Sequence, residues 1–175
     1  MLFKIQKKKL KKNKITWINQ VNKIKKLPSI FLANEFFDAM AIKQFIKKKD
    51  LWFEKFVELR SEKKAAFFEK KTNIKKLEKK INLNISKNQR FIEYSEYGLN
   101  YLKEICKIIK KNDGGLLIID YGYSEKKMRD TLKGISKHKF ANILENIGNT
   151  DITHNINFNL FNKFIKQIGN LESNL

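Results

Sequence analysis

The stretch "SIFLANEFFDAM", residues 29–40, places polar side chains directly behind a short apolar run. The run from Ile30 to Ala33 predicts a buried strand, and Asn34 and Glu35 follow it at once. Asp38 comes after two phenylalanines. Either these polar groups belong to a ligand site, or the carboxylates cap a following helix, whose N-terminal end favours negative charge.

A second apolar run ends in the same way. Residues 116–119, "LLII", lead straight into Asp120 and Tyr121. Continuous apolar runs are typical of parallel strands that are covered on both faces. In open α/β sheets, ligands bind outside the carboxyl ends of such strands. The two strand ends therefore predict a single site at one edge of an α/β sheet.

The remaining sequence predicts helices and strands around these two runs. Ser95 is a candidate N-cap for a helix that the turn-forming "NDGG" at 112–115 ends. Asn157 is expected to cap a helix that Gly169 stops. The other expected elements are a basic helix over Leu2 to Leu10, a strand over Lys14 to Ile18, a turn or helix from Phe36 to Met40, a hairpin of residues 42–46 and 51–59 (with helix as the alternative for its second arm), and a helix over 62–80.

The composition indicates one domain with a strongly basic charge. The chain has 175 residues, enough for a single core, and a net charge of +20. Its 38 basic residues are 35 lysines and three arginines, spread through loops and apolar runs alike. Since arginine is preferred for phosphate and base recognition, we interpret the charge as a compositional bias rather than a nucleic-acid site. Residues 60–90 are expected to form an exposed, Lys-rich variable insertion.

Cysteine and histidine usage predicts neither disulfides nor a metal site. The single cysteine, Cys106, fits a reducing compartment and a small buried side chain. His138 and His154 have no third ligand at a suitable spacing. The N-terminus lacks the apolar segment of a signal peptide, and no apolar run approaches the ~20 residues of a membrane span. We therefore expect a cytoplasmic chain with no membrane span.

Four motifs follow one another in a familiar order. They are "FLANEFFDAMAIKQF" at 31–45, "GGLLIIDYGY" at 114–123, "DTLKGISKHKF" at 130–140 and "NTDITHNINF" at 149–158. Together they resemble the signature segments of the MidA family, class I S-adenosylmethionine-dependent methyltransferases that include the mitochondrial complex I assembly factor. The chain departs from the family at Met40-Ala41 (usually Leu-Pro), His154 (commonly Ala) and Asn157 (usually Asp).

The resemblance implies an α/β fold: a partial class I methyltransferase (Rossmann-like) sheet with an inserted hairpin and helical segments. Lys14–Ile18, Ser29–Ala33 and Leu116–Ile119 would be its third, fourth and fifth strands. None of the seven glycines lies in a Gly-x-Gly-x-Gly turn or precedes Gly98. Compared with the family, the chain starts after the second strand and stops before the last ones. We therefore expect residues 1–175 to form a single partial domain that alone binds S-adenosylmethionine weakly or not at all; a complementing chain that carries the missing strands is a candidate partner.

The resemblance also implies roles for the residues at the strand ends. The family includes a protein arginine methyltransferase, and a carboxylate can bind a guanidinium group through two hydrogen bonds. Glu35 is expected to bind the guanidinium, Asp38 to support its loop and Asn34 to contact the cofactor or the substrate. The other expected site residues are Asp120 as a catalytic residue and Tyr121, Tyr123, His138, Asp151 and Thr153 as substrate-binding residues; packing is the alternative for the tyrosines, a structural role for His138 and turn capping for Asp151 and Thr153.

Three functions stay open on the sequence. The first is an S-adenosylmethionine-dependent protein arginine methyltransferase acting on a complex I (NADH dehydrogenase) subunit, here as a truncated fragment; the relatives in eukaryotes would be mitochondrial. The second is a non-catalytic partner in assembly of a respiratory complex. The third is a basic nucleic-acid-binding protein, which the scattered lysines and the family motifs argue against.

Overall fold

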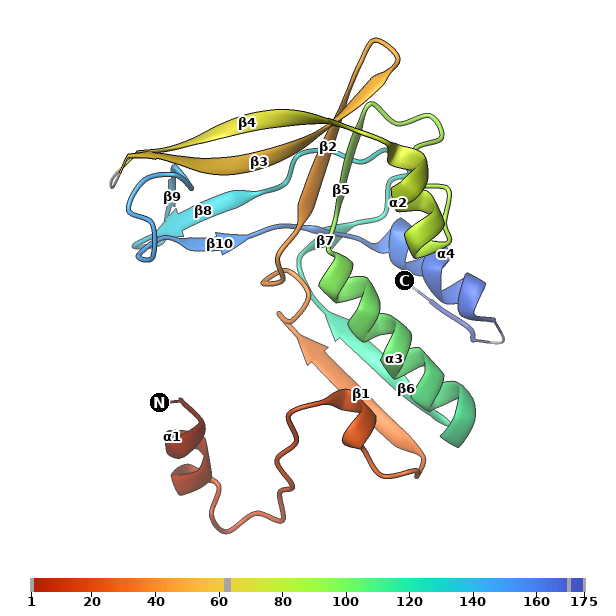
Figure 1. Cartoon of the computed structure of the whole chain (residues 1–175). Helices are drawn as coiled ribbons and strands as arrows, with labels where there is room; N and C mark the ends of the chain where they lie inside the picture. The colour runs from red at the N-terminus through yellow and green to blue at the C-terminus, as the bar shows by residue number, and fades with distance from the viewer. Residues whose placement is uncertain (1, 62–63, 170, 175) are drawn as a thin grey trace.

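The computed structural model describes residues 2–61, 64–169 and 171–174. Figure 1 shows the arrangement of its helices and strands. In chain order these are α1 (Leu2–Lys9), the 3₁₀ turn η1 (Val21–Lys23), β1 (Ser29–Asn34), β2 (Lys43–Lys48), β3 (Leu51–Ser61), β4 (Lys64–Thr72), α2 (Ile74–Ile81), β5 (Phe91–Tyr94), α3 (Glu96–Asn112), β6 (Gly114–Ile119), β7 (Gly122–Tyr123), β8 (Lys133–Ser136), β9 (Lys139–Ala141), β10 (Asp151–Thr153), β11 (Ile156–Asn157) and α4 (Phe158–Ile168).

β1 and β6 form the predicted parallel pair, with Ser29 opposite Gly114 and Asn34 opposite Ile119. Helix α3 lies along one face of the pair (Figure 1), where Leu116 and Ile118 pack against the core. Ser95 Oγ caps α3 by accepting a hydrogen bond from Gly98 N–H at 2.9 Å, which confirms the predicted cap.

The predicted strand over Lys14 to Ile18 is wrong. These residues have no regular secondary structure and pair with no strand in the described part of the chain. Ile15 and Ile18 are exposed, while Trp17 packs edge to face on Phe3 of α1, with ring centroids 5.2 Å apart. An apolar run becomes a strand only when a neighbour supplies its hydrogen-bond partners, and no described strand does so here.

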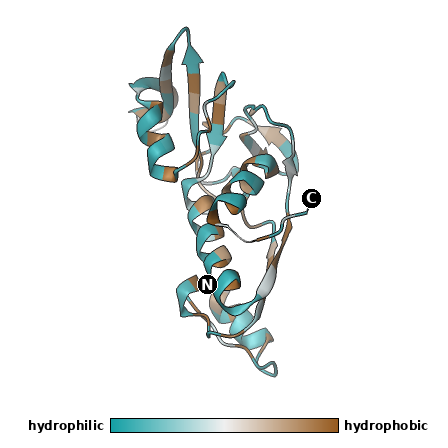
Figure 2. Ribbon diagram, turned by 90° about the vertical axis from the view of Figure 1, so that its right-hand side faces the viewer, coloured by the Kyte–Doolittle hydropathy of each residue, from teal (hydrophilic) through white to brown (hydrophobic). Residues whose placement is uncertain are grey.

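The second sheet is antiparallel, with strand order β4-β3-β2-β5. The predicted hairpin is confirmed in β2 and β3, and hydrophobic and hydrophilic bands alternate along the strands (Figure 2). The predicted helix over 62–80 is wrong for residues 64–72, which form β4, and correct for the part that lies in α2; residues 62 and 63 lie outside the described residues. Pairing with β3 overrides local helix propensity there, as the stacked rings of Phe56 and Phe68 illustrate, with centroids 5.4 Å apart.

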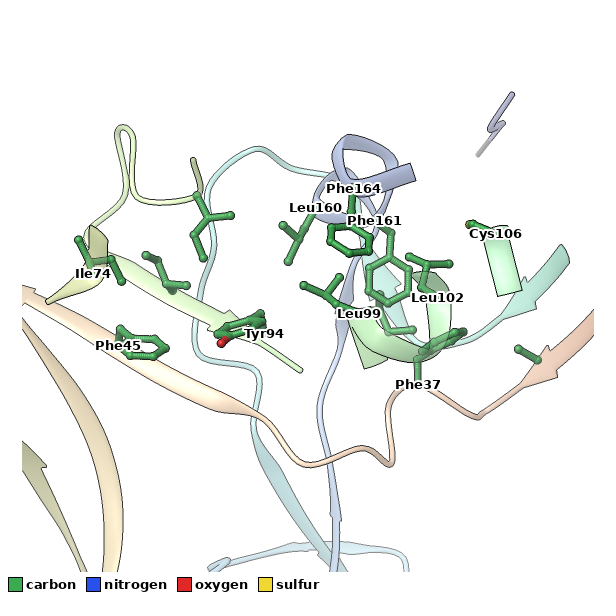
Figure 3. Packing of buried hydrophobic residues seen from close by; sticks show 14 of the residues in the cluster. Phe37, Phe45, Ile74, Tyr94, Leu99, Leu102, Cys106, Leu160, Phe161 and Phe164 are labelled. Atoms are coloured by element: carbon green, nitrogen blue, oxygen red, sulfur yellow. The ribbon is translucent and has the colours of Figure 1, made fainter. Parts of the chain in front are cut away.

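The hydrophobic core gathers where α3, α4 and the antiparallel sheet meet (Figure 3). Phe37 is 1% exposed and packs edge to face on Phe161 of α4, with centroids 5.1 Å apart. Asn157 caps α4 as predicted, since its Oδ1 accepts a hydrogen bond from Leu160 N–H at 2.9 Å. Ile74 and Ile85 also join this core, so the expectation that the 60–90 segment is exposed is wrong at these two positions.

Two small sheets complete the fold. β10, β8 and β9 form an antiparallel sheet, and β11 pairs in parallel with β7.

Cys106 is buried in α3, as expected, and burial raises the pKa of its thiol to about 11. A thiol with such a pKa is protonated and inert at neutral pH.

Candidate functional site at the ends of β1 and β6

The carboxylate of Asp120 fastens the turn that follows β1 to the end of β6. Its Oδ2 accepts hydrogen bonds from the backbone N–H groups of Phe36 at 3.1 Å, Phe37 at 2.9 Å and Asp38 at 3.4 Å. Its Oδ1 accepts a fourth, from Tyr121 N–H at 2.9 Å. Residues 36–40 form the turn that the sequence allowed as an alternative to a helix. The ends of β1 and β6 are thus held together by the carboxylate of Asp120, the residue directly after β6.

The side chain of Glu35, the residue just before this turn, is exposed. Its backbone N–H donates to Ile119 O at 2.9 Å, and its φ of 45° lies in the left-handed region, which is uncommon for a residue other than glycine. Asn34, the preceding residue, is also exposed. Backbone strain of this kind is concentrated at functional sites, where the surroundings hold it in place. The fixed turn therefore presents the Asn34 and Glu35 side chains to solvent.

Asp38 points the other way, into a buried contact with β10. It is 8% exposed, and its Oδ2 accepts a hydrogen bond from Thr153 Oγ1 at 2.8 Å. Its backbone carbonyl accepts from His154 N–H at 3.2 Å. Asp38 Oδ1 and His154 Nε2 are both buried without a hydrogen-bond partner among the described residues. Asp38, Thr153 and His154 therefore meet behind the turn, and His154 was not among the predicted site residues.

The two predicted tyrosines have different environments. Tyr121 is 62% exposed beside Asp120. Tyr123 is buried, and its ring lies under the Arg129 guanidinium, 4.4 Å from the ring centroid. Burial raises the pKa of the Tyr123 hydroxyl. Tyr121 is thus accessible to a ligand, whereas one face of Tyr123 is already occupied by a cation.

His138 and Asp151 do not join the strand ends. His138 lies with a φ of 62° in the exposed turn between β8 and β9, well apart from the end of β1 in Figure 1. Asp151 is exposed at the start of β10, two residues before Thr153. No hydrogen bond in the described part of the structure connects either residue to the turn.

A buried carboxylate in β5 was missed by the sequence reasoning. Glu93 is 4% exposed and accepts hydrogen bonds from Gln44 Nε2 at 2.6 Å and from Thr131 N–H at 3.3 Å and Oγ1. Thr131 Oγ1 in turn accepts from Asn155 N–H at 2.9 Å. The signal was an acidic residue at an inward position of the strand "FIEY", which needs polar partners when buried. This network joins the antiparallel sheet to the segment that carries Thr153.

Comparison with known proteins identifies the family. The model of the family described as "Putative S-adenosyl-L-methionine-dependent methyltransferase" matches residues 1–174. The chain belongs to this methyltransferase family. Among its curated relatives, protein arginine methyltransferase NDUFAF7, mitochondrial, from Danio rerio is 27% identical over 85% of this chain and 35% of its own. The human protein of the same name is 26% identical over 82% of this chain and 32% of its own.

The chain therefore spans about a third of the length of these curated relatives. Solved structures from Burkholderia thailandensis share the fold. The match to one of them includes 96% of this chain and 47% of the solved chain, with a TM-score of 0.73 and 15% sequence identity. Another, bound to S-adenosyl-homocysteine, covers 88% of this chain and 41% of its own at a TM-score of 0.66. The fold is thus a partial class I methyltransferase fold, as the sequence predicted.

The residues that the structure describes do not form a complete S-adenosylmethionine site. Glycines let a backbone approach a ligand closely, but Gly122, the glycine next to the carboxyl ends of the strands, serves packing. A Cβ on Gly122 would overlap the Phe158 ring. At the strand ends, Asn34, Glu35 and Tyr121 have exposed side chains. These three exposed side chains form the rim of the strand ends, and no methyl-transfer step follows from the described residues alone.

The described residues contain no group of three His, Cys, Asp or Glu side chains placed to hold a metal ion. Within the same residues, no helix combines the length and hydrophobicity needed to cross a bilayer.

Proposed function

We propose that this chain is the substrate-binding part of an S-adenosylmethionine-dependent protein arginine methyltransferase domain. The supporting observation is the turn that Asp120 fixes at the joint end of β1 and β6, which presents Glu35 to solvent. The Glu35 carboxylate has no hydrogen-bond or ion-pair partner among the described residues, so both of its oxygens are available to a guanidinium group. A planar guanidinium binds a carboxylate through two parallel hydrogen bonds.

The other site residues take supporting roles in this proposal. Asp120 would hold the turn that positions Glu35 rather than contact the substrate, because its oxygens already accept four backbone hydrogen bonds. Asp38 fixes the same turn through Thr153. Asn34 and Tyr121 lie at the exposed rim, where Asn34 would contact cofactor or substrate and Tyr121 the substrate. Substrate contacts of Tyr123, His138 and Asp151 stay predictions.

We propose further that the cofactor cradle comes from polypeptide beyond residues 1–175, in the same chain or another. The first support is the open face of the parallel pair: Ile30 and Leu32 in β1 are 81% and 68% exposed, and Leu117 and Ile119 in β6 are 55% and 50% exposed. Parallel sheets are normally covered on both faces, and α3 covers only one. The four side chains form an apolar surface that a helix of the same domain would bury.

The second support is the open edge of β1. Ser29 N–H donates to Asp113 O at 3.2 Å and Glu35 N–H to Ile119 O at 2.9 Å. Because backbone groups alternate between the two sides of a strand, the N–H groups of Ile30 and Leu32 face away from β6. No strand in the described residues pairs with that side. The longer solved relatives, of which this chain covers 47% and 41%, have the additional length to supply one.

The relatives' names suggest the substrate class. Since the curated proteins are named protein arginine methyltransferases, we propose a protein substrate with an accessible arginine. These relatives are named mitochondrial; a complex I subunit as the substrate and a cytoplasmic location for this chain stay predictions. Within the partial domain, residues 60–90 would be a family-variable insertion anchored through Ile74 and Ile85.

A non-catalytic role in assembly is the second candidate. It is favoured by Gly122, the glycine next to the carboxyl ends of the strands, which packs against the Phe158 ring and leaves no room there for a cofactor. In that case the Glu35 surface would bind a protein without methylating it. The two candidates share guanidinium binding and differ in methyl transfer once the missing polypeptide is supplied.

The test is binding of a fluorescent peptide that carries one arginine and no other charge. Glu35→Gln removes the carboxylate charge at constant size, and we expect affinity to fall roughly tenfold. Asp50→Asn, at the fully exposed β2–β3 turn, is the matched control and should leave affinity unchanged. A citrulline peptide should bind the parent chain as weakly as the arginine peptide binds Glu35→Gln. Equal affinity of Glu35→Gln and the parent chain would refute the assignment.

A further inference from the structure

A basic groove lies between the loop before β5, the loop after β7 and the start of α4. It consists of two adjoining hollows of about 350 Å³ and 780 Å³, which share Asn88, Gln89 and Lys127. The first hollow also contains Lys87, Lys126 and Lys163. The second adds Lys47, Lys49 and Arg90, with Asp50 as the one acidic residue among those that line it. None of these residues belongs to the proposed guanidinium site.

The lysines of the first hollow have no counter-ion among the described carboxylates. Elsewhere basic side chains do find carboxylates, as in Lys107 with Glu104 at 2.8 Å and Lys48 with Glu69 at 2.5 Å. By contrast, Lys87, Lys126, Lys127 and Lys163 form no ion pair with any described carboxylate. Like charges that converge on a hollow raise its positive potential and attract anions. The groove is therefore an anion-binding surface rather than a solvated face of paired charges.

The walls of the groove are fixed and its floor is apolar. Gln89 Nε2 donates to Lys126 O at 2.8 Å, and Gln89 Oε1 accepts from Met128 N–H at 2.9 Å. These two hydrogen bonds hold the loop after β7 against the loop before β5. Ile85 and Leu160 are buried beneath, and Met128 is partly buried. A ligand can therefore place an apolar group on a preformed floor while its anionic groups meet the lysines.

The lining favours a polypeptide over a nucleic acid. Neither hollow is lined by an aromatic side chain, so bases would find no stacking partner. Six of the seven cations are lysines, which lack the planar fork that recognises phosphate. The side-chain amides of Asn84, Asn88 and Asn159 offer donors and acceptors that match a peptide backbone. We propose that the groove binds an acidic polypeptide segment with an apolar side chain that packs near Met128.

The test is fluorescence anisotropy with a short labelled peptide of glutamates around one leucine. Lys87→Gln with Lys127→Gln removes two charges from the groove. Lys8→Gln with Lys11→Gln removes two exposed charges at the N-terminus, so both variants carry a net charge of 20 − 2 = +18. We expect the groove variant to bind about fivefold or more weakly than the parent chain, with the control near the parent value. Equal losses in the two variants would refute the groove, because net charge alone would explain them.

Two further arms separate the ligand classes and the two sites. A single-stranded oligonucleotide of the same charge should bind more weakly than the peptide and respond equally to both variants; tighter, groove-dependent binding would assign the groove to nucleic acid instead. A peptide without leucine should lose affinity, and no loss would refute contact with the floor. Glu35→Gln should leave acidic-peptide binding unchanged, so failure here is separable from failure of the proposed guanidinium site. Circular dichroism of each variant checks that the fold is retained.

Discussion

The antiparallel sheet β4-β3-β2-β5 and the parallel pair β1-β6 differ in how their strands are connected and in how much of their surface is buried. The antiparallel sheet joins β2 to β3 through Lys49 and Asp50, and its β5 contributes Ile92, which is fully buried. The parallel pair brings together β1 and β6, which lie far apart in the sequence, and one of its faces stays exposed. Hairpins form from neighbouring residues at a small entropic cost, whereas a parallel sheet depends on distant segments.

This difference shows which part of the domain the chain can stabilise alone. Side chains from α3, α4 and the antiparallel sheet form the buried core. The parallel pair contributes side chains to it only from its inner face. The outer face of that pair adds little to folding, because its side chains remain in water. The region with the most recognisable motifs is therefore also the region that the buried core stabilises least.

The largest expected effect contrasts the two sides of the β1 region. Phe37→Ala removes a ring that is 1% exposed and packs on Phe161, so we expect a loss of about 3–5 kcal/mol in the free energy of unfolding. Leu32→Ala, on the open face, should change stability by less than ~0.5 kcal/mol. Urea unfolding followed by circular dichroism measures both. A large loss for Leu32→Ala would show that the open face is covered in solution.

A smaller effect is expected at the network that joins the antiparallel sheet to the segment that carries Thr153. Glu93→Ala leaves the Thr131 N–H and hydroxyl groups without their acceptor and should cost about 1–3 kcal/mol of stability. Glu93→Gln keeps an acceptor oxygen at similar size and should cost less. The same urea unfolding measurement compares the two variants. If alanine and glutamine were equally destabilising, the charge of Glu93 rather than its hydrogen bonds would dominate.

Local sequence signals predicted the elements that local interactions decide. The caps Ser95 and Asn157 and the β2–β3 hairpin follow from short-range chemistry, and each is present. The predictions for Lys14 to Ile18 and for residues 64–72 of the helix over 62–80 were wrong, because strand formation depends on distant partners. The first has no described strand to pair with, and residues 64–72 of the second pair with β3.

The candidate site shows the same limit. That two strands end in acidic residues was visible in the sequence, and the parallel register brings Asn34 opposite Ile119, next to Asp120. Which carboxylate would face solvent was not predictable, because it depends on where three backbone N–H groups point. Those groups select Asp120, and Glu35 is left exposed. The contact of Asp38 with Thr153 is a long-range event that no local pattern encodes.

The smallest expected effect concerns single backbone amides of β1. Alternation along the strand directs the N–H groups of Phe31 and Ala33 toward β6 and those of Ile30 and Leu32 toward the open edge. We therefore expect hydrogen exchange, measured by NMR, to be fast at Ile30 and Leu32 and slow at Phe31 and Ala33. Uniform protection along β1 would mean that a strand already occupies the edge. Polypeptide that completes the sheet should slow exchange at Ile30 and Leu32 selectively, because only their N–H groups would gain acceptors.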